Sequence, residues 1–71
     1  MPIQHKKEFG CYHWDTFDNE TFLLDGGEFD TLDEAVKFVE EKYKGRIRSN
    51  GADQVDIVDS KGNIRKKFPV G

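Results

Sequence analysis

Cysteine is the scarcest reactive residue of this 71-residue chain, because Cys11 stands alone. A single thiol excludes an internal disulfide and a zinc site built from several thiolates, so we expect a reducing, cytoplasmic setting. No apolar run approaches the roughly 20 residues of a membrane-spanning helix, and no membrane partner is expected. No apolar segment follows Lys6 and Lys7. Residues 1–7 are therefore predicted to be a polar arm and not a signal peptide.

The chain also lacks the length for a deep cavity. A domain of this size buries only about 60% of its unfolded surface, whereas ligand pockets occupy roughly 300–1,000 Å³. The spacing of a calcium loop is absent, and the acidic residues around Gly26 and Gly27 oppose binding of a phosphate at the following helix. We therefore expect no catalytic residue, no enzymatic activity and no cofactor.

One segment, residues 29–45, has the features of a complete helix. Thr31 and Glu34 have the spacing of a capping box, and Gly45 can adopt the left-handed conformation that ends a helix. The apolar residues recur at helical spacing and predict one buried stripe: Leu32, Val36, Val39 and Tyr43, widened by Ala35 and Phe38.

Two strand pairs flank this helix. The first is predicted over 8–17 and 21–24, where Asp25-Gly26-Gly27 ends the second strand. The second is predicted over 54–59 and 63–68, joined by the turn Asp59-Ser60-Lys61-Gly62. Between helix and second pair, 46–53 is either a loop, which we favour, or a short edge strand around Ile47 beside the turn signal Asn50-Gly51.

The element order predicts an α+β fold of β-hairpin, α-helix and β-hairpin, with one antiparallel sheet and the helix packed on one face. Residues 8–71 then form a single small domain. The expected core combines the helix stripe with inward strand residues: Leu32, Val36, Val39, Tyr43, Val55, Ile57, Ile64 and Phe68.

Several of these motifs occur together in known families. Trp14, the sequence Phe29-Asp30-Thr31 before Glu34-Ala35, and the turn from Asp59 to Gly62 resemble a family of short bacterial proteins of unknown function, over roughly residues 14–71. Gly27 with Thr31-Leu32-Asp33-Glu34-Ala35 is also similar to antitoxins of the HicB kind, although the Pro-Gly-Cys element of those proteins is missing. Neither resemblance implies a catalytic residue.

A metal site is one interpretation of Cys11, His13 and Asp15. These three residues alternate along a predicted strand and therefore share one face, and His5 could add a fourth ligand. Strand spacing alone does not bring three side chains onto one ion. The simpler interpretation is a solvent-facing strand without a metal, and we favour it.

Exposed aromatic residues favour a contact surface for another protein. One helix cannot cover every aromatic residue of the first hairpin, so we expect Tyr12, Trp14 and Phe17 to meet a partner. Alternatively, the hairpin shields itself or forms a homodimer. The favoured function is a non-enzymatic protein-interaction or regulatory module whose partner is unknown.

Charge supports an alternative function. Residues 8–41 contain eleven acidic residues and one basic residue, whereas residues 42–71 contain eight basic and three acidic residues. Binding to nucleic acid or an acidic partner would use a basic patch, and the protein would then be a nucleic-acid-associated accessory protein similar to an antitoxin. The candidate residues of this patch are Arg46, Arg48, Lys61, Arg65, Lys66 and Lys67.

Overall fold

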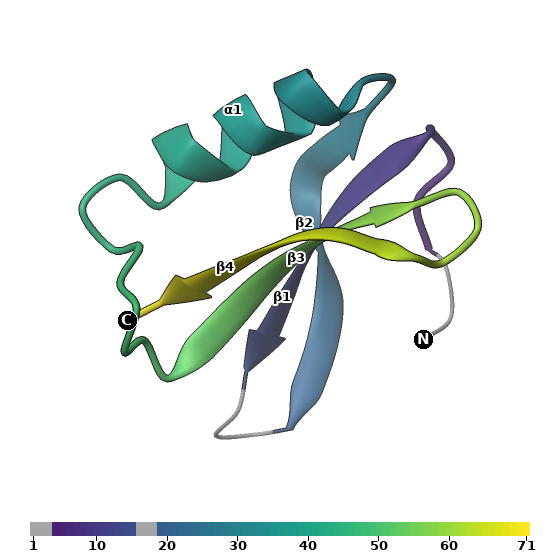
Figure 1. Ribbon diagram of the computed structural model, residues 1–71. Coiled ribbons are helices and arrows are strands. Elements are labelled where there is room, and N and C mark those ends of the chain that lie inside the picture. Colours follow the sequence, from purple (N-terminus) through teal and green to yellow (C-terminus); the bar gives the residue numbers. More distant parts are fainter. Residues whose placement is uncertain (1–3, 16–18) are drawn as a thin grey trace.

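The computed structural model describes residues 4–15 and 19–71. The elements in chain order are β1 (Phe9–Asp15), β2 (Glu20–Phe29), α1 (Leu32–Lys42), β3 (Asp53–Asp59) and β4 (Ile64–Val70). The strands form one antiparallel sheet in the order β2-β1-β3-β4, with α1 across one face (Figure 1). The predicted α+β fold is confirmed. In the described ranges, no helix is both long and apolar enough to cross a membrane.

Helix α1 begins at the predicted cap, Thr31, and ends at Lys42, three residues before the predicted closing residue Gly45. Thr31 is the N-cap, and its hydroxyl oxygen accepts a hydrogen bond from the backbone N–H of Glu34. The same hydroxyl donates to the Glu34 carboxylate at 3.0 Å, so the side chains bond to each other. Tyr43 is the C-cap, and Gly45 follows with φ of +80°. These local interactions define both ends without help from the sheet.

Strand β2 is longer than predicted. Asp25-Gly26-Gly27 does not end it, because Gly26 adopts φ of +73° and forms an irregularity within the strand. Between the pairs Tyr12–Leu23 and Gly10–Glu28, one residue of β1 lies opposite four residues of β2. Pairing then resumes and continues to Phe29, so the strand leads directly to the start of α1.

The segment between α1 and β3 is largely the loop that we favoured. Within it, Ile47 forms one isolated antiparallel bridge to Val70. This bridge is the part of the alternative edge strand that is present. The backbone N–H of Arg48 donates to the Pro69 carbonyl, and that of Gly71 donates to the Arg46 carbonyl. This loop therefore covers the outer edge of β4 at its C-terminal end.

The turn between β3 and β4 confirms the prediction for residues 59–62. The backbone N–H of Gly62 donates to the Asp59 carbonyl at 3.1 Å, and Gly62 has φ of +86°. The Asp59 carboxylate accepts from the backbone N–H groups of Asn63 and Lys61, both at 2.9 Å. The Asn63 N–H bond is the main cause that lowers the pKa of Asp59 below its usual range, so the carboxylate stays charged and keeps the turn closed.

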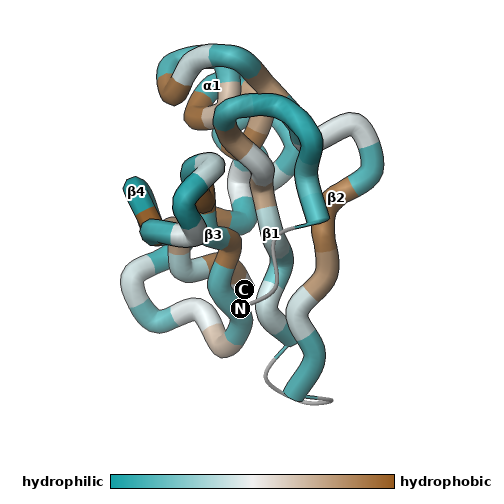
Figure 2. The backbone as a smooth tube through the Cα atoms, turned by 90° about the vertical axis from the view of Figure 1, so that its right-hand side faces the viewer, coloured by the Kyte–Doolittle hydropathy of each residue, from teal (hydrophilic) through white to brown (hydrophobic). Residues whose placement is uncertain are grey.

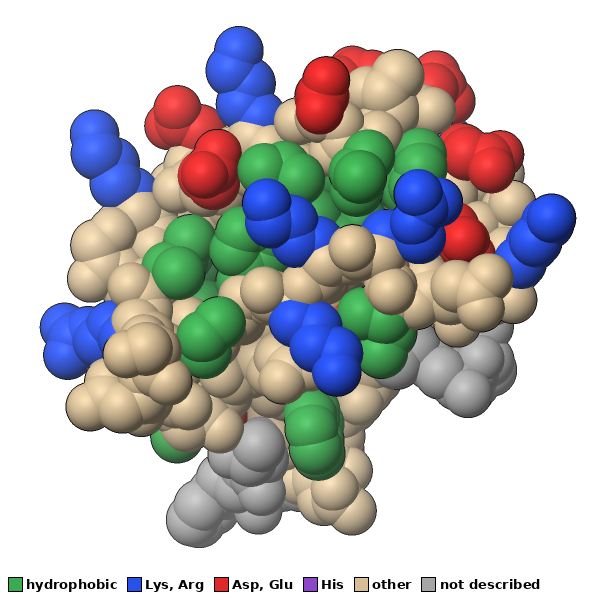
Figure 3. Space-filling view, viewed as in Figure 1, with side chains coloured by type: hydrophobic (Ala, Val, Ile, Leu, Met, Phe, Trp, Pro, Cys, Tyr) green, Lys and Arg blue, Asp and Glu red, His purple; other side chains and the backbone are tan. Residues whose placement is uncertain are grey.

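The sheet order keeps the two hairpins beside each other and not interleaved (Figures 1 and 2). The acidic half of the sequence therefore occupies α1 and one side of the sheet, and β4 carries basic residues on the other side. Figure 3 shows acidic side chains along α1 with some basic ones beside them, further basic side chains over β4, and hydrophobic side chains between the helix and β4. The separation of charge along the sequence is thus incomplete in space, because Lys37 and Lys42 lie on α1 and three aspartates lie on β3 beside β4.

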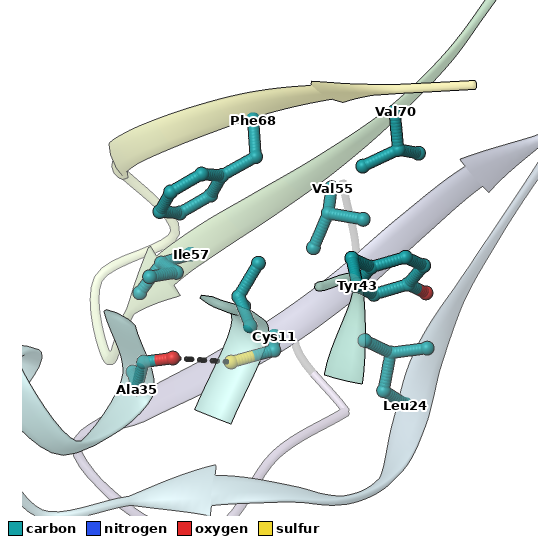
Figure 4. Close-up of a cluster of buried hydrophobic side chains, with 9 residues drawn as sticks. Cys11, Leu24, Ala35, Tyr43, Val55, Ile57, Phe68 and Val70 are labelled. Atoms are coloured by element: carbon teal, nitrogen blue, oxygen red, sulfur yellow. Dashed lines mark hydrogen bonds between the residues drawn. The ribbon is translucent and has the colours of Figure 1, made fainter. Parts of the chain in front are cut away.

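The core lies between α1 and the sheet (Figure 4). Five predicted members are buried there: Val39, Tyr43, Val55, Ile57 and Phe68. Leu32 and Val36 are only partly buried at its border, because Ala35 and Val39 form the centre of the helix face. The core also contains residues that the prediction omitted: Cys11, Leu24 and Val70.

The prediction that Ile64 points into the core is wrong. The register of β3 and β4 shifts between Ile57 and Val58, so Ile57 pairs with Lys66 while Val58 pairs with Ile64. Arg65 is the extra residue of this bulge, and it reverses the alternation of side chains along β4. Ile64 consequently lies on the face away from α1 and remains 43% exposed.

The face of the sheet opposite α1 is partly covered by the N-terminal segment. The Tyr12 hydroxyl oxygen accepts from the backbone N–H groups of Gln4 and His5, and it lies 2.7 Å from His5 Nδ1. Because two N–H groups already donate to this oxygen, its own hydrogen is directed to Nδ1. A Cβ at Gly10 would lie 2.5 Å from the His5 ring. Glycine at this position therefore lets the segment dock on the sheet.

Candidate partner-binding surface

An apolar hollow lies beside α1. Phe29 at the end of β2 and Phe38 on the helix form its floor, with ring centroids 5.2 Å apart. Glu34, Lys37 and Glu41 form its rim. Glu34 and Glu41 are four and three residues from Phe38. Lys37 is three and four residues from these two, so each contacts a neighbour on the same side of the helix. The hollow is open to solvent and has a volume of about 390 Å³, which is room for one or two apolar side chains.

Tyr12 and Trp14, two of the three predicted aromatic contact residues, do not form an open surface together. Tyr12 is 1% exposed and hydrogen-bonded to the N-terminal segment, so it belongs to the fold, which corrects the expectation for this residue. Trp14 is 38% exposed on the face away from α1. Phe17 lies outside the described residues. The most exposed aromatic residue that the structure describes is Phe22, at 46%.

His13 connects three elements beneath Phe22. Its Nε2 lies 3.2 Å from the Asp53 carboxylate, and its Nδ1 lies 2.9 Å from the Tyr43 hydroxyl. A carboxylate only accepts, so Nε2 carries a proton and Nδ1 of the neutral ring accepts from Tyr43. Burial raises the pKa of Tyr43, and the Arg46 guanidinium acts in the opposite direction. The phenol therefore stays a neutral donor, and the cluster ties the end of α1 to the sheet.

The metal-site interpretation of Cys11, His13 and Asp15 finds no common centre. Cys11 is buried under α1, and its thiol donates to the Ala35 carbonyl at 3.8 Å (Figure 4). Both ring nitrogens of His13 have protein partners. Within residues 4–15 and 19–71, no group of three His, Cys, Asp or Glu side chains is arranged to hold a metal ion. Cys11 faces the core and not the solvent, contrary to the interpretation that we favoured.

Alkaline pH is expected to destabilise the protein through Cys11. Burial raises the pKa of this thiol from 9.0 to about 12, so the folded state prefers the neutral thiol. This contribution is complete below pH 9 and is lost as pH rises towards 12, with a slope of at most about 1.4 kcal/mol per pH unit. Urea unfolding at several pH values should show a steeper alkaline loss for the native protein than for Cys11→Ala. Equal slopes would contradict this assignment.

The predicted basic patch does not form one continuous surface. Arg65 lies 3.7 Å from Asp59 and above the Phe9 ring, and Lys66 lies above the Phe68 ring. Lys67 pairs with Asp56 and projects from the opposite face of the sheet. Arg46 covers Tyr43 and donates to the Gly71 carbonyl. Several basic side chains therefore contact the fold, while Lys61 and Arg48 lie at opposite ends of β4.

No family model, curated protein or solved structure matches the chain.

The hollow beside α1 is not predicted by the sequence. The sequence places Phe38 at the edge of the buried stripe and Phe29 in a helix-start motif, and neither pattern indicates that the two rings meet. Their proximity depends on how the chain passes from β2 into α1, and the spacing of residues in the sequence does not predict this.

Proposed function

We propose that the protein is a small non-enzymatic protein-binding module and that the hollow beside α1 is its contact site. The observation that carries this proposal is the pair Phe29 and Phe38, which offer partly buried aromatic surface at the floor of an open hollow. Apolar floors with polar rims are typical of the centres of protein interfaces. The open shape of the hollow suits an inserted side chain of a partner better than a small substrate, which binds in a more enclosed pocket.

The charge around the hollow indicates the kind of partner. Glu34 and Glu41 border it against a single Lys37, and Asp30 and Asp33 are exposed near the start of the same helix. A partner segment with an apolar side chain between basic residues is complementary to this surface. Charge complementarity of this kind accelerates association and makes it dependent on salt.

Reversing one rim charge tests this site. Glu41→Lys is expected to weaken partner capture several-fold at low salt, because it repels the basic flank of the partner. Glu40→Lys is the matched control, since Glu40 is exposed on the same helix but does not line the hollow. The measurement is quantitative affinity capture from cell extract with native protein and both variants. Proteins retained equally by both variants would contradict the proposed site.

A second variant addresses the floor of the hollow. Phe38→Ala should abolish capture of the same proteins while leaving a folded domain, because Phe38 lies at the border of the core. Circular dichroism checks the fold.

An electrophoretic mobility assay with nucleic acid at low salt separates this proposal from the nucleic-acid alternative, because phosphate contacts are strongest at low salt. A shift at low salt without any protein captured would favour the alternative.

A further inference from the structure

The two edges of the sheet differ in how well they are protected. At the outer edge of β4, the bulge at Arg65, the lysines that follow and Pro69 all oppose pairing with another strand. The bridge from Ile47 to Val70 covers its end. Strand β4 therefore has several of the features that natural proteins use to prevent association through an edge.

The outer edge of β2 lacks these features over residues 20–24. This segment, Glu-Thr-Phe-Leu-Leu, contains no lysine and no proline, and its pairing with β1 is regular from Glu20 to Leu23. Among the described residues, β1 is the neighbour of β2 in the sheet, and the other side of β2 has none. The irregularity at Gly26 follows only after this segment. An open row of backbone donors and acceptors thus remains available.

Phe22 lies in the middle of this open segment. Its ring stacks on His13, with centroids 5.4 Å apart and planes inclined by 13°, and 46% of the residue is exposed. His13 is itself held by Tyr43 and Asp53. Phe22 is therefore a supported aromatic residue at the edge of the sheet, on the same face as α1.

Symmetry limits how two copies of β2 could pair. In an antiparallel pair related by a two-fold axis, facing residues share one face of the sheet, so one residue faces its own copy and the axis passes midway between the two. An axis at Leu24 would place Glu20 opposite Glu28, and like charges directly opposite are unfavourable. An axis at Phe22 places Phe22 opposite its own copy and Glu20 opposite Leu24. This register gives an aromatic pair without facing carboxylates.

We propose that the protein forms a two-fold symmetric dimer through antiparallel pairing of β2, centred on Phe22, which creates a continuous eight-stranded sheet. The occupant of this edge is a second copy of the chain. The site is separate from the hollow beside α1, so the dimer does not depend on the function proposed for that hollow. Pairing of β2 with β2 uses the β2 edge of both copies, so assembly stops at the dimer. Pairing of β2 with β4 would leave a free edge on each copy and would continue into a filament.

Sedimentation equilibrium over roughly 1 μM to 1 mM tests the dimer. The native protein should show a monomer–dimer equilibrium. Phe22→Lys should raise the dissociation constant at least about tenfold, because it removes the aromatic pair and places like charges opposite each other. Trp14→Lys is the matched control, since it also replaces an exposed aromatic residue, but on the inner strand β1. A native protein that stays monomeric, or a dimer weakened equally by both variants, overturns the proposal.

Mixing tests the register. If residue 22 faces its own copy, Phe22→Lys and Phe22→Glu should each, when alone, dimerise more weakly than the native protein and should form a heterodimer when mixed. A mixture that stays monomeric overturns the register centred on Phe22.

If the charged variants do not fold, Phe22→Cys replaces them. Under mild oxidation it should form a disulfide-linked dimer, because facing Cα atoms in an antiparallel pair lie about 4.5–5.5 Å apart, a distance that a disulfide spans, whereas Trp14→Cys should not. Equal cross-linking of both cysteine variants also overturns the proposal.

Discussion

Val39→Asp is expected to unfold the protein, whereas Val36→Asp should leave it folded. Val39 is completely buried at the centre of the helix face, and an unpaired carboxylate there costs several kcal/mol. A domain of this size is stable by only about 3–5 kcal/mol. Val36 is partly buried at the border of the core, so its carboxylate can reach water. We expect the second variant to lose about 1–2 kcal/mol.

Circular dichroism and urea unfolding distinguish these two variants. Val39→Ala is a useful third variant, because it removes only apolar contact and should cost about 2 kcal/mol. If Val36→Asp unfolds the protein and Val39→Asp does not, the helix presents another face to the sheet. The comparison therefore tests the orientation of α1 and not only its presence.

Gly51→Ala is the second substitution for which we expect a large loss of stability. A Cβ at this position would lie 2.6 Å from the backbone nitrogen of Val70 and closer still to its carbonyl group. Backbone atoms cannot move aside as a flexible side chain can, so the loop over residues 46–51 would have to separate from β4. We expect a loss of about 3 kcal/mol, measured by urea unfolding.

Gly45→Ala is the matched control for this prediction. Gly45 has φ of +80°, but a Cβ there would meet no atom within 4 Å. Its substitution should therefore cost only the strain of a left-handed residue, about 1–2 kcal/mol. If Gly51→Ala is no more harmful than Gly45→Ala, the close approach to Val70 is not important for stability.

Gly51 also illustrates what a sequence pattern leaves open. Asn50-Gly51 is typical of a two-residue hairpin turn, yet no strand pair closes at this point. The glycine is required because the backbone of Val70 passes beside it. That reason depends on a segment about twenty residues away in the chain. Local turn propensity is therefore consistent with glycine at this position but does not reveal the contact that requires it.

The aromatic residues of the first hairpin show the same limit. The alternation of Cys11 and His13 places both on one face, but it does not tell which face α1 will cover. Pairing with β3 on one side and β2 on the other makes β1 an inner strand. Cys11 is then buried beneath the helix, and Tyr12 is covered by the N-terminal segment.

The sequence by itself determined the elements whose stability is local. The cap at Thr31, the turn at Asp59 and the left-handed Gly45 depend on hydrogen bonds and backbone preferences within a few residues, so they could be predicted together with the α+β class. The tertiary structure decided the strand order, the bulge that turns Ile64 outward, and the meeting of Phe29 with Phe38. These features depend on the register between distant segments, which is set by packing of the whole core and not by any short stretch of sequence.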